Sequence, residues 1–474
     1  MAEKRNEYTY INEWLATMGY RPDARMSQLI SSWWGWFTAD NGFYEYKERR
    51  MFRTYKVERL TLHPFRFAAE TWSDLLMPEL RITSPDKAMQ DEVVKRCFDG
   101  FGMDRSDFVA RAFALGTGAL ALEFQDVTED AMLNPDAVVR IADFDASQVL
   151  PLTWSDDDCT QAAFASRVEV DGRDYDQCQA HVLVGGSYHI VTQLFDLKNH
   201  KPVEVEGIAH DFDTRSPWPT FAFVRPAVAN VHFDHCAMGA SVCEKGIDAV
   251  KMVDEAFTSM HKHIRVGGPK VFIDDTMIEK NKKTTPSGET VTTYSAFGQA
   301  DDVIFRMRPA NEGGKQMEVV QPDLKVDENE EAINTALKLL SVTCGFGNGY
   351  FSWDAHTGIR TATEVKADNS SLALSLHRHQ NALAKSIERI VRGTAGALRG
   401  VCGVGVDPMA ELSIDFDDSI ITDTPSEKNM AMAEIGALGV PALKVRYLMR
   451  WYNMTEEEAL AAVATQDASA YEGM

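Results

Sequence analysis

No run of about 18 apolar residues occurs anywhere in the sequence, so no transmembrane helix is expected. The stretch from Met1 to Tyr8 also lacks the apolar segment of a secretory signal. We therefore expect neither export nor membrane spanning, and folding in the cytoplasm of the cell that makes the chain.

Cysteine motifs are missing as well. The seven cysteines are an odd number, are widely spread and include no CxxC pair. Zinc ribbons and disulfide frameworks use closely spaced or even sets. Free buried thiols are therefore the expected state.

The sequence also lacks the common signatures of enzymes. GxSxG, HExxH and GxxxxGK[ST] do not occur, and no Ser, Cys or Lys stands out as a nucleophile. The glycine-rich stretch 345–349 has no following lysine and does not open directly onto a helix, both of which phosphate binding uses. We expect no catalytic activity and no cofactor.

One enzymatic alternative stays open. His232, Asp234, His235 and Cys236 are metal-capable residues within five positions, so a metal-dependent hydrolase with a site near His232–Cys236 is the runner-up. A strand end with one exposed and one packed side chain explains the cluster more simply. No bound metal is therefore expected.

The charge excludes a DNA clamp. The chain has 48 basic and 71 acidic residues, a formal net charge of −23, whereas a protein that grips phosphates needs the opposite balance. One segment near the front is basic and interleaved with tyrosine and phenylalanine. Nucleic-acid binding stays open there, but we favour a contact with another subunit or with a protein shell, which also uses Arg and Tyr. The basic residues are Lys47, Arg49, Arg50, Arg53, Lys56, Arg59 and Arg66.

A chain of 474 residues is long for one core, and its pattern is that of an α+β protein with several subdomains. Residues 10–40 and 86–115 have helical periodicity, the second with Asp104 or Ser106 as a cap. Glycines at 116 and 118 then precede a predicted strand over 119–124. Alternation predicts an antiparallel region over 138–231.

The second half alternates long helices with short strands. A helix is predicted from 238, with a heptad seam from Gly246 to Ile264 that favours packing against neighbours, and Gly267-Gly268-Pro269 ends it. Short strands and turns follow over 270–325. A helix capped by Asp327 and a long helix capped by Thr361 come next. A strand over 412–417 and helices over 426–438 and 455–463 complete the chain.

The loop between the last two long helices has an unusual composition. It contains glycines at 345, 347, 349 and 358, which tolerate changes of φ and ψ, together with bulky Tyr350, Phe351 and Trp353. Mobility and bulk together predict a movable steric constriction. The alternative is that these aromatic side chains are buried against the long helix.

Two junctions carry a resemblance to a known family. Ala114-Leu-Gly-Thr-Gly-Ala119 leads from a helix into a sheet, and Thr361-Ala-Thr-Glu-Val365 follows the glycine-aromatic loop. Together with the order of elements over roughly residues 50–465, they resemble the portal proteins of tailed bacteriophages, siphophage type. The resemblance implies a portal-like ring subunit with these parts: wing, 1–237; first stem helix, 238–266; small α/β clip, 267–326; second stem helix, 327–345; tunnel loop, 346–360; long wing helix, 361–400; wing strand return, 401–422; helical crown, 423–474.

The resemblance also implies a function. Such a ring, dodecameric in the virion, sits at one capsid vertex, where DNA is packaged and ejected. The implied partners are further copies of the chain, the major capsid protein, the terminase large subunit, a head-tail adaptor protein and double-stranded DNA that passes without tight binding. The implied location is the virion, after synthesis in the cytoplasm of a bacterial host.

The implied site residues fall into three sets. The channel or tunnel loop comprises Gly347, Asn348, Gly349, Tyr350, Phe351, Ser352, Trp353, Asp354, Ala355, His356, Thr357 and Gly358. The stem-packing residues are Val250, Val253, Phe257, Met260, Ile264, Ile333, Leu337 and Leu340. The clip interface contains Lys280, Lys282, Lys283, Arg306 and Arg308.

Overall fold

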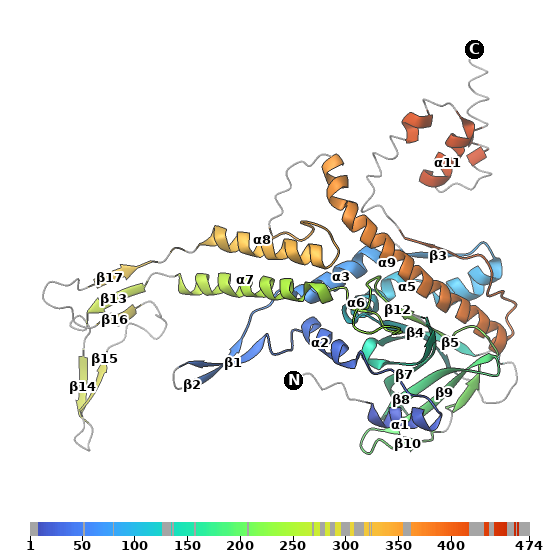
Figure 1. Ribbon diagram of the computed structural model, residues 1–474, viewed down its shortest axis with the longest axis horizontal. Coiled ribbons are helices and arrows are strands. Elements are labelled where there is room, and N and C mark those ends of the chain that lie inside the picture. Colours follow the sequence, from blue (N-terminus) through green and yellow to red (C-terminus); the bar gives the residue numbers. More distant parts are fainter. Residues whose placement is uncertain are drawn as a thin grey trace, which may run out of the picture.

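The computed structural model contains both helices and strands, in agreement with the predicted α+β class (Figure 1). It describes residues 8–50, 53–78, 80–125, 134, 137–155, 158–205, 208–267, 270–274, 280–284, 290–294, 304–307, 317–321, 323, 325–353, 362–416, 431–435, 440–452, 459–460 and 462–463.

The strands are β1 (Glu45–Arg50), β2 (Arg53–Glu58), β3 (Arg81–Thr83), β4 (Gly118–Gln125), β5 (Val138–Asp145), β6 (Val149–Ser155), β7 (Asp158–Val170), β8 (Arg173–Val184), β9 (Ser187–Asp196), β10 (Pro202–Val203), β11 (Asp211–Asp213), β12 (Phe221–Val224), β13 (Lys270–Asp274), β14 (Lys280–Thr284), β15 (Thr290–Tyr294), β16 (Ile304–Met307), β17 (Met317–Val320) and β18 (Ser413–Asp415). The α-helices are α1 (Thr9–Thr17), α2 (Ser27–Phe37), α3 (Pro64–Leu76), α4 (Lys95–Cys97), α5 (Phe101–Asp104), α6 (Ser106–Leu115), α7 (Ile247–Val266), α8 (Val326–Thr343), α9 (Ala362–Ala397) and α11 (Pro441–Tyr452). Single π-helical turns, η1 (Met89–Val94) and η5 (Leu398–Cys402), precede α4 and follow α9, and short 3₁₀ turns lie at η2 (Ala146–Gln148) and η3 (Glu244–Gly246).

Two antiparallel sheets form the body. One has the order β10-β9-β8-β7-β6, with β11 also paired to β9, and the other has the order β12-β4-β5. The predicted antiparallel region is therefore confirmed for residues 138–224. The predicted glycine break and strand are confirmed too, because Gly116 ends α6 at a φ of 79° and β4 begins at Gly118.

The two N-terminal helical predictions are confirmed only in part. Residues 10–40 form α1 and α2 rather than one helix, because Gly19 takes a φ of 87° and Pro22 has no N–H to donate. The stretch 86–115 is likewise broken near Gly100, whose φ is 67°. The predicted cap is wrong, since α6 starts after Arg105 without a side-chain capping bond.

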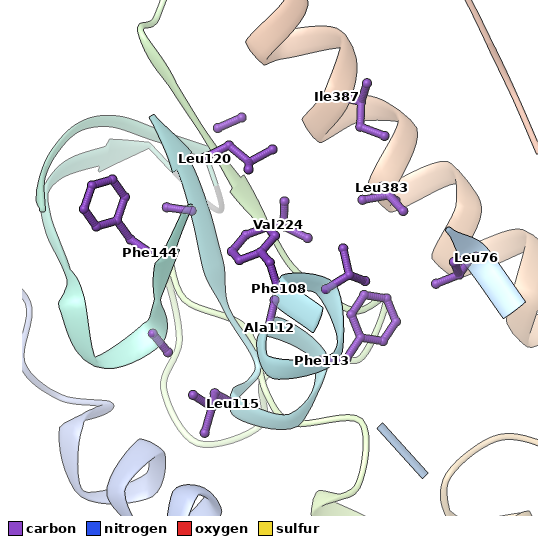
Figure 2. Close-up of a cluster of buried hydrophobic side chains, with 14 of the residues drawn as sticks. Leu76, Phe108, Ala112, Phe113, Leu115, Leu120, Phe144, Val224, Leu383 and Ile387 are labelled. Atoms are coloured by element: carbon purple, nitrogen blue, oxygen red, sulfur yellow. The ribbon is translucent and has the colours of Figure 1, made fainter. Parts of the chain in front are cut away.

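The core lies where α9 crosses the smaller sheet. Leu383 and Ile387 of α9 are buried in one apolar cluster with Leu120 of β4 and Val224 of β12. Figure 2 shows these side chains gathered between α9, α6 and the two strands. Leu372, Leu376 and Ile390 of the long helix lie in the same buried cluster. Six of the seven free cysteines are buried, in agreement with the prediction for the thiols.

A pair of helices, α7 and α8, extends away from the body, and strands lie beyond its far end (Figure 1). The first helix begins at Ile247 and not at 238, since 3₁₀ turn η3 precedes it. The second begins at Val326, so Asp327 lies in its first turn and the predicted cap is wrong. Within the described residues of 270–320 there are only strands, in the order β16-β13-β17 and as the hairpin β14-β15. These residues contain none of the helix expected of an α/β clip.

The C-terminal part was predicted least well. The predicted strand over 412–417 is confirmed but shorter, and it pairs with β3 from the other end of the chain. Helix α11 was missed, although Pro441 is suited to a first helical turn. Residues 431–435 are helical, and Thr455 lies outside the described residues. Among the described helices, none is both long and apolar enough to cross a bilayer.

Candidate assembly and channel surfaces

The stem-packing residues are brought together mainly within the chain. Val250 and Val253 of α7 share the main apolar cluster with Ile333, Leu337 and Leu340 of α8, and all five are buried. Gly246 allows this close approach, because a methyl group there would lie 2.8 Å from the sulfur of Cys344. The inner half of the seam therefore faces its own chain rather than a neighbour.

The outer half of the seam is more open. Phe257 and Met260 are half-buried, and Ile264 is 54% exposed. His263 near this end lies 3.1 Å from the side-chain oxygen of Asn329, which links α7 to the start of α8. The exposed end of α7 is the part of the predicted seam that is free to meet another copy.

A buried carboxylate joins the stem to the segment before it. Asp254 of α7 accepts hydrogen bonds from the Tyr44 hydroxyl at 2.7 Å, the Thr61 hydroxyl at 2.9 Å and the Leu62 backbone N–H at 2.8 Å. Burial raises the pKa of Asp254, although these three donors act in the opposite direction. Burial and the adjacent Asp254 also raise the pKa of Tyr44.

Tyr44 directly precedes β1, and Thr61 follows β2 in the sequence. The bonds to Asp254 therefore attach the incoming and the outgoing chain at the base of this hairpin to α7. A signal for this residue is present in the sequence, because Asp254 lies among the apolar positions 250, 253 and 257 of one helix face.

The first half of the predicted tunnel loop is packed. Gly345, Gly347 and Gly349 have positive φ angles of 89°, 86° and 76°. They turn the chain so that Phe346 stacks on Trp72 of α3, with 4.4 Å between ring centroids, and Phe351 lies 5.1 Å from Phe67.

Phe346 and Phe351 are 2% and 5% exposed, whereas Tyr350 and Trp353 are 39% and 42% exposed. Backbone bonds hold this part of the loop, since the Phe351 N–H donates to the Ser341 hydroxyl and the Trp353 N–H to the Asn334 side chain. Phe346 and Phe351 thus pack toward α3 and α8. Asp354, Ala355, His356, Thr357 and Gly358 lie outside the described residues.

The predicted clip interface is divided between two sheets. Lys280, Lys282 and Lys283 lie on β14, whereas Arg306 lies on β16, which pairs with β13. Arg308 lies outside the described residues. Whether these positions form one docking surface stays a prediction.

The residues of the metal-site alternative point to separate partners. The His232 ring pairs with Glu244, while the Cys236 thiol faces Asp23 at 3.8 Å. In the part of the chain that the structure describes, no three His, Cys, Asp or Glu side chains are grouped to hold a metal ion.

A cavity of about 860 Å³ lies next to this segment, between the loop 225–239 and α9. Its lining includes Arg225, Arg378, Lys385 and Arg389 together with Asp158, Asp234, His235 and Cys236, so its four Arg and Lys side chains outnumber its two carboxylates. The geometry does not favour a hydrolase.

The comparisons with known proteins found no family profile and no curated protein that match the sequence. Among solved structures, the chain is similar to one described as the neck of a native GTA particle computed with C12 symmetry. The identity is 12% and the TM-score 0.43, over 88% of this chain and 92% of that one. A second, from the virion of a native gene transfer agent particle, has 12% identity and a TM-score of 0.40 over 86% and 89% of the two chains.

Proposed function

We propose that this chain is a non-enzymatic structural subunit of a phage portal ring, which forms the channel for DNA at one capsid vertex. The observation that carries the proposal is the path of the chain through the stem. Helix α7 leaves the body, strands β13 to β17 follow beyond its far end, and α8 returns to the glycine-aromatic loop before α9 (Figure 1). The sequence resemblance implies this order of wing, stem, clip and long helix. Virion location and docking of the terminase large subunit, the major capsid protein and a head-tail adaptor belong to the same proposal.

The charge of the chain suits a conduit. Each phosphate contact adds salt-dependent affinity, and a sliding DNA must leave every contact that it makes. A formal net charge of −23 keeps such affinity low. A polyanion can therefore pass a ring of these subunits without being retained.

Assembly is the first test. We expect light scattering after size exclusion to give a large closed oligomer, and twelve copies of a 52.9 kDa chain correspond to roughly 630 kDa. Negative-stain images of the same fraction should show rings with a central opening. A monomer at every salt and protein concentration tried, also in the presence of the capsid components, would contradict the proposal.

The exposed aromatic of the loop gives a second test. We expect Trp353→Ala to leave ring formation intact, because Trp353 is 42% exposed, but to reduce the amount of DNA protected per particle in a packaging assay. Phe351→Ala is the matched comparison, since it removes a buried ring and should lower stability by about 3 kcal/mol. If the Trp353 variant packages and retains DNA like the parent, the loop is not a constriction.

A further inference from the structure

The sheet β1-β2 is an isolated hairpin with a strongly basic end. We call it the basic hairpin, residues 45–58. Residues 47–56 contain five basic side chains and one acidic side chain. Its register places Lys47 opposite Lys56 and Arg50 opposite Arg53. Like charges directly opposite one another destabilise an antiparallel pair, and a lone two-stranded hairpin is marginal in water. The basic segment 47–56 therefore has the charge that favours binding of an anionic partner.

The side chains of the basic hairpin are available to such a partner. Lys47, Arg49 and Lys56 are exposed, and Tyr46 and Tyr55 are 36% and 48% exposed. Lys56 already pairs with Glu45 at 3.1 Å and with Glu58 at 3.2 Å. Among the side chains that the structure describes, none pairs with Lys47 or Arg49. Exposed tyrosine beside arginine is a composition typical of protein interfaces.

The base of the basic hairpin is fixed, so its direction is set by the stem. The three hydrogen bonds to Asp254 hold both ends of the hairpin on α7, and Arg59 adds a contact of 3.7 Å to Glu255. In Figure 1 the basic hairpin lies on one side of α7 and α8 lies on the other. In a ring, all copies pack side by side in the same orientation, with one face of each copy against the opposite face of the next. Such packing would bring the hairpin of one copy to the α8 side of the next.

The start of α8 has the complementary charge. Asp327, Glu328 and Glu331 are exposed, and Glu330 is half-buried. In Figure 1 strands β1 and β2 lie beside the part of the stem that includes this end of α8. If the ring axis runs along the stem, the rotation that relates neighbouring copies leaves positions along the stem unchanged, so the hairpin of one copy and the start of α8 in the next stay at matching heights. Opposite charges across an interface steer association and fix its register.

We infer that the basic hairpin binds a second copy of this chain, with Lys47 and Arg49 against the acidic start of α8 of the neighbouring subunit. The inference rests on the proposed ring and names one contact between its subunits. DNA is the alternative anionic partner. Two observations count against it: the carboxylates of Glu45 and Glu58 lie at the base of the hairpin, and tight phosphate contacts would hinder DNA that has to slide through a channel. DNA binding is therefore treated as an outcome of the test.

The test is a charge exchange. One variant carries Lys47→Glu and Arg49→Glu, a second carries Glu328→Lys and Glu331→Lys, and a third combines all four changes. At about 0.15 M salt, we expect the first two to need about ten-fold more protein for half assembly by light scattering, and the third to return to the wild-type value. The matched control, Lys198→Glu with Lys201→Glu, reverses two exposed charges near β10 and should assemble like the parent.

A second measurement uses the unaltered protein. A carbodiimide couples amines to carboxylates without a spacer, and mixing isotope-labelled with unlabelled chains identifies couplings between copies. We expect Lys47 or Lys56 to be coupled to Glu328 or Glu331 of another copy.

The outcomes separate the inference from the function on which it rests. If wild type forms rings but both two-site variants assemble normally, or if the combined variant is not restored, the hairpin contact is wrong while the ring stands. If the hairpin variant assembles normally but loses binding of labelled duplex DNA, the partner is DNA and the inference is overturned. If the wild-type chain never assembles, the proposed ring is contradicted, and the hairpin contact that depends on it is contradicted as well.

Discussion

Replacing Gly393 of α9 with alanine is expected to prevent the body from folding normally. A methyl group on Gly393 would lie 2.1 Å from the carbonyl oxygen of Pro219 and 3.2 Å from its carbon. Both are backbone atoms, which cannot turn away as a side chain can. Alanine gains about 1 kcal/mol of helix propensity over glycine. Overpacking typically costs about 1 to 3 kcal/mol, and the upper end is expected here because the contacted atoms belong to the backbone, so the clash dominates.

The same face of the helix repeats this feature. Methyl groups on Gly396 and Gly400 would lie 2.4 Å from the Ser216 hydroxyl oxygen and 2.2 Å from the Thr214 carbonyl oxygen. The three glycines are spaced i, i+3 and i+7, so they form one line along which segment 214–220 crosses α9 and η5.

The measurement is the urea midpoint followed by tryptophan fluorescence, together with soluble yield. Gly405→Ala is the control, because no atom lies within 4 Å of the added methyl group, and its midpoint should not change. Gly400→Ala should behave like Gly393→Ala. An unchanged midpoint for Gly393→Ala would mean that α9 does not cross the 214–220 segment at backbone contact.

Replacing Asp254 with leucine is expected to release the basic hairpin from the stem. The change leaves the Tyr44 hydroxyl, the Thr61 hydroxyl and the Leu62 N–H without their acceptor. Each buried donor left unpaired costs about 1 to 3 kcal/mol, so a total loss on the order of 4 kcal/mol is expected. Limited proteolysis should then cut near residues 44–62, where wild type resists, and oligomer formation should fall.

Asparagine at the same position gives a sharper comparison. Asp254→Asn keeps an acceptor oxygen but removes the charge. Because burial raises the pKa of Asp254 in the folded protein, the folded state holds this proton more tightly than the unfolded state. Wild type therefore loses stability from this group as the pH rises through the carboxyl range, and the asparagine variant does not. Its stability relative to wild type should increase from about pH 4 to pH 7. A constant difference would mean that Asp254 is not buried as a carboxylate.

The predicted elements that were confirmed depend on local pattern. The positive φ of Gly116 and the alternation over 138–224 act within a few residues, so each can be read from a short window of sequence. The apolar positions of α9 fall in this class as well, because the spacing of Leu383, Ile387 and Ile390 fixes one helix face. Errors at helix starts have a local cause too. At Lys325 and Arg105 the chain begins a helix without the side-chain cap that the pattern predicted.

The residues of the candidate surfaces were recognised unevenly. The glycine-aromatic loop and the basic stretch were identified because their compositions are unusual in themselves. The burial of Phe351 was left open as an alternative, but its partner was assigned to the long helix, whereas Phe351 lies against Phe67 of α3. Asp254 was passed over, because its three donors come from residues nearly two hundred positions or more away.

Sequence pattern alone was enough to predict the α+β class, the antiparallel region, the apolar face of α9, the burial of most thiols and one short basic segment in an acidic chain. These properties follow from side-chain spacing and composition, which are fixed before any distant contact forms. Which of these faces meet could be seen only in the folded chain. It placed α8 over the inner half of the α7 seam, paired β18 with β3, and set the glycine line of α9 on residues 214–220. Many partners satisfy an apolar stripe or an open strand edge equally well. The choice among them depends on shape and on buried hydrogen bonds between residues far apart in the chain.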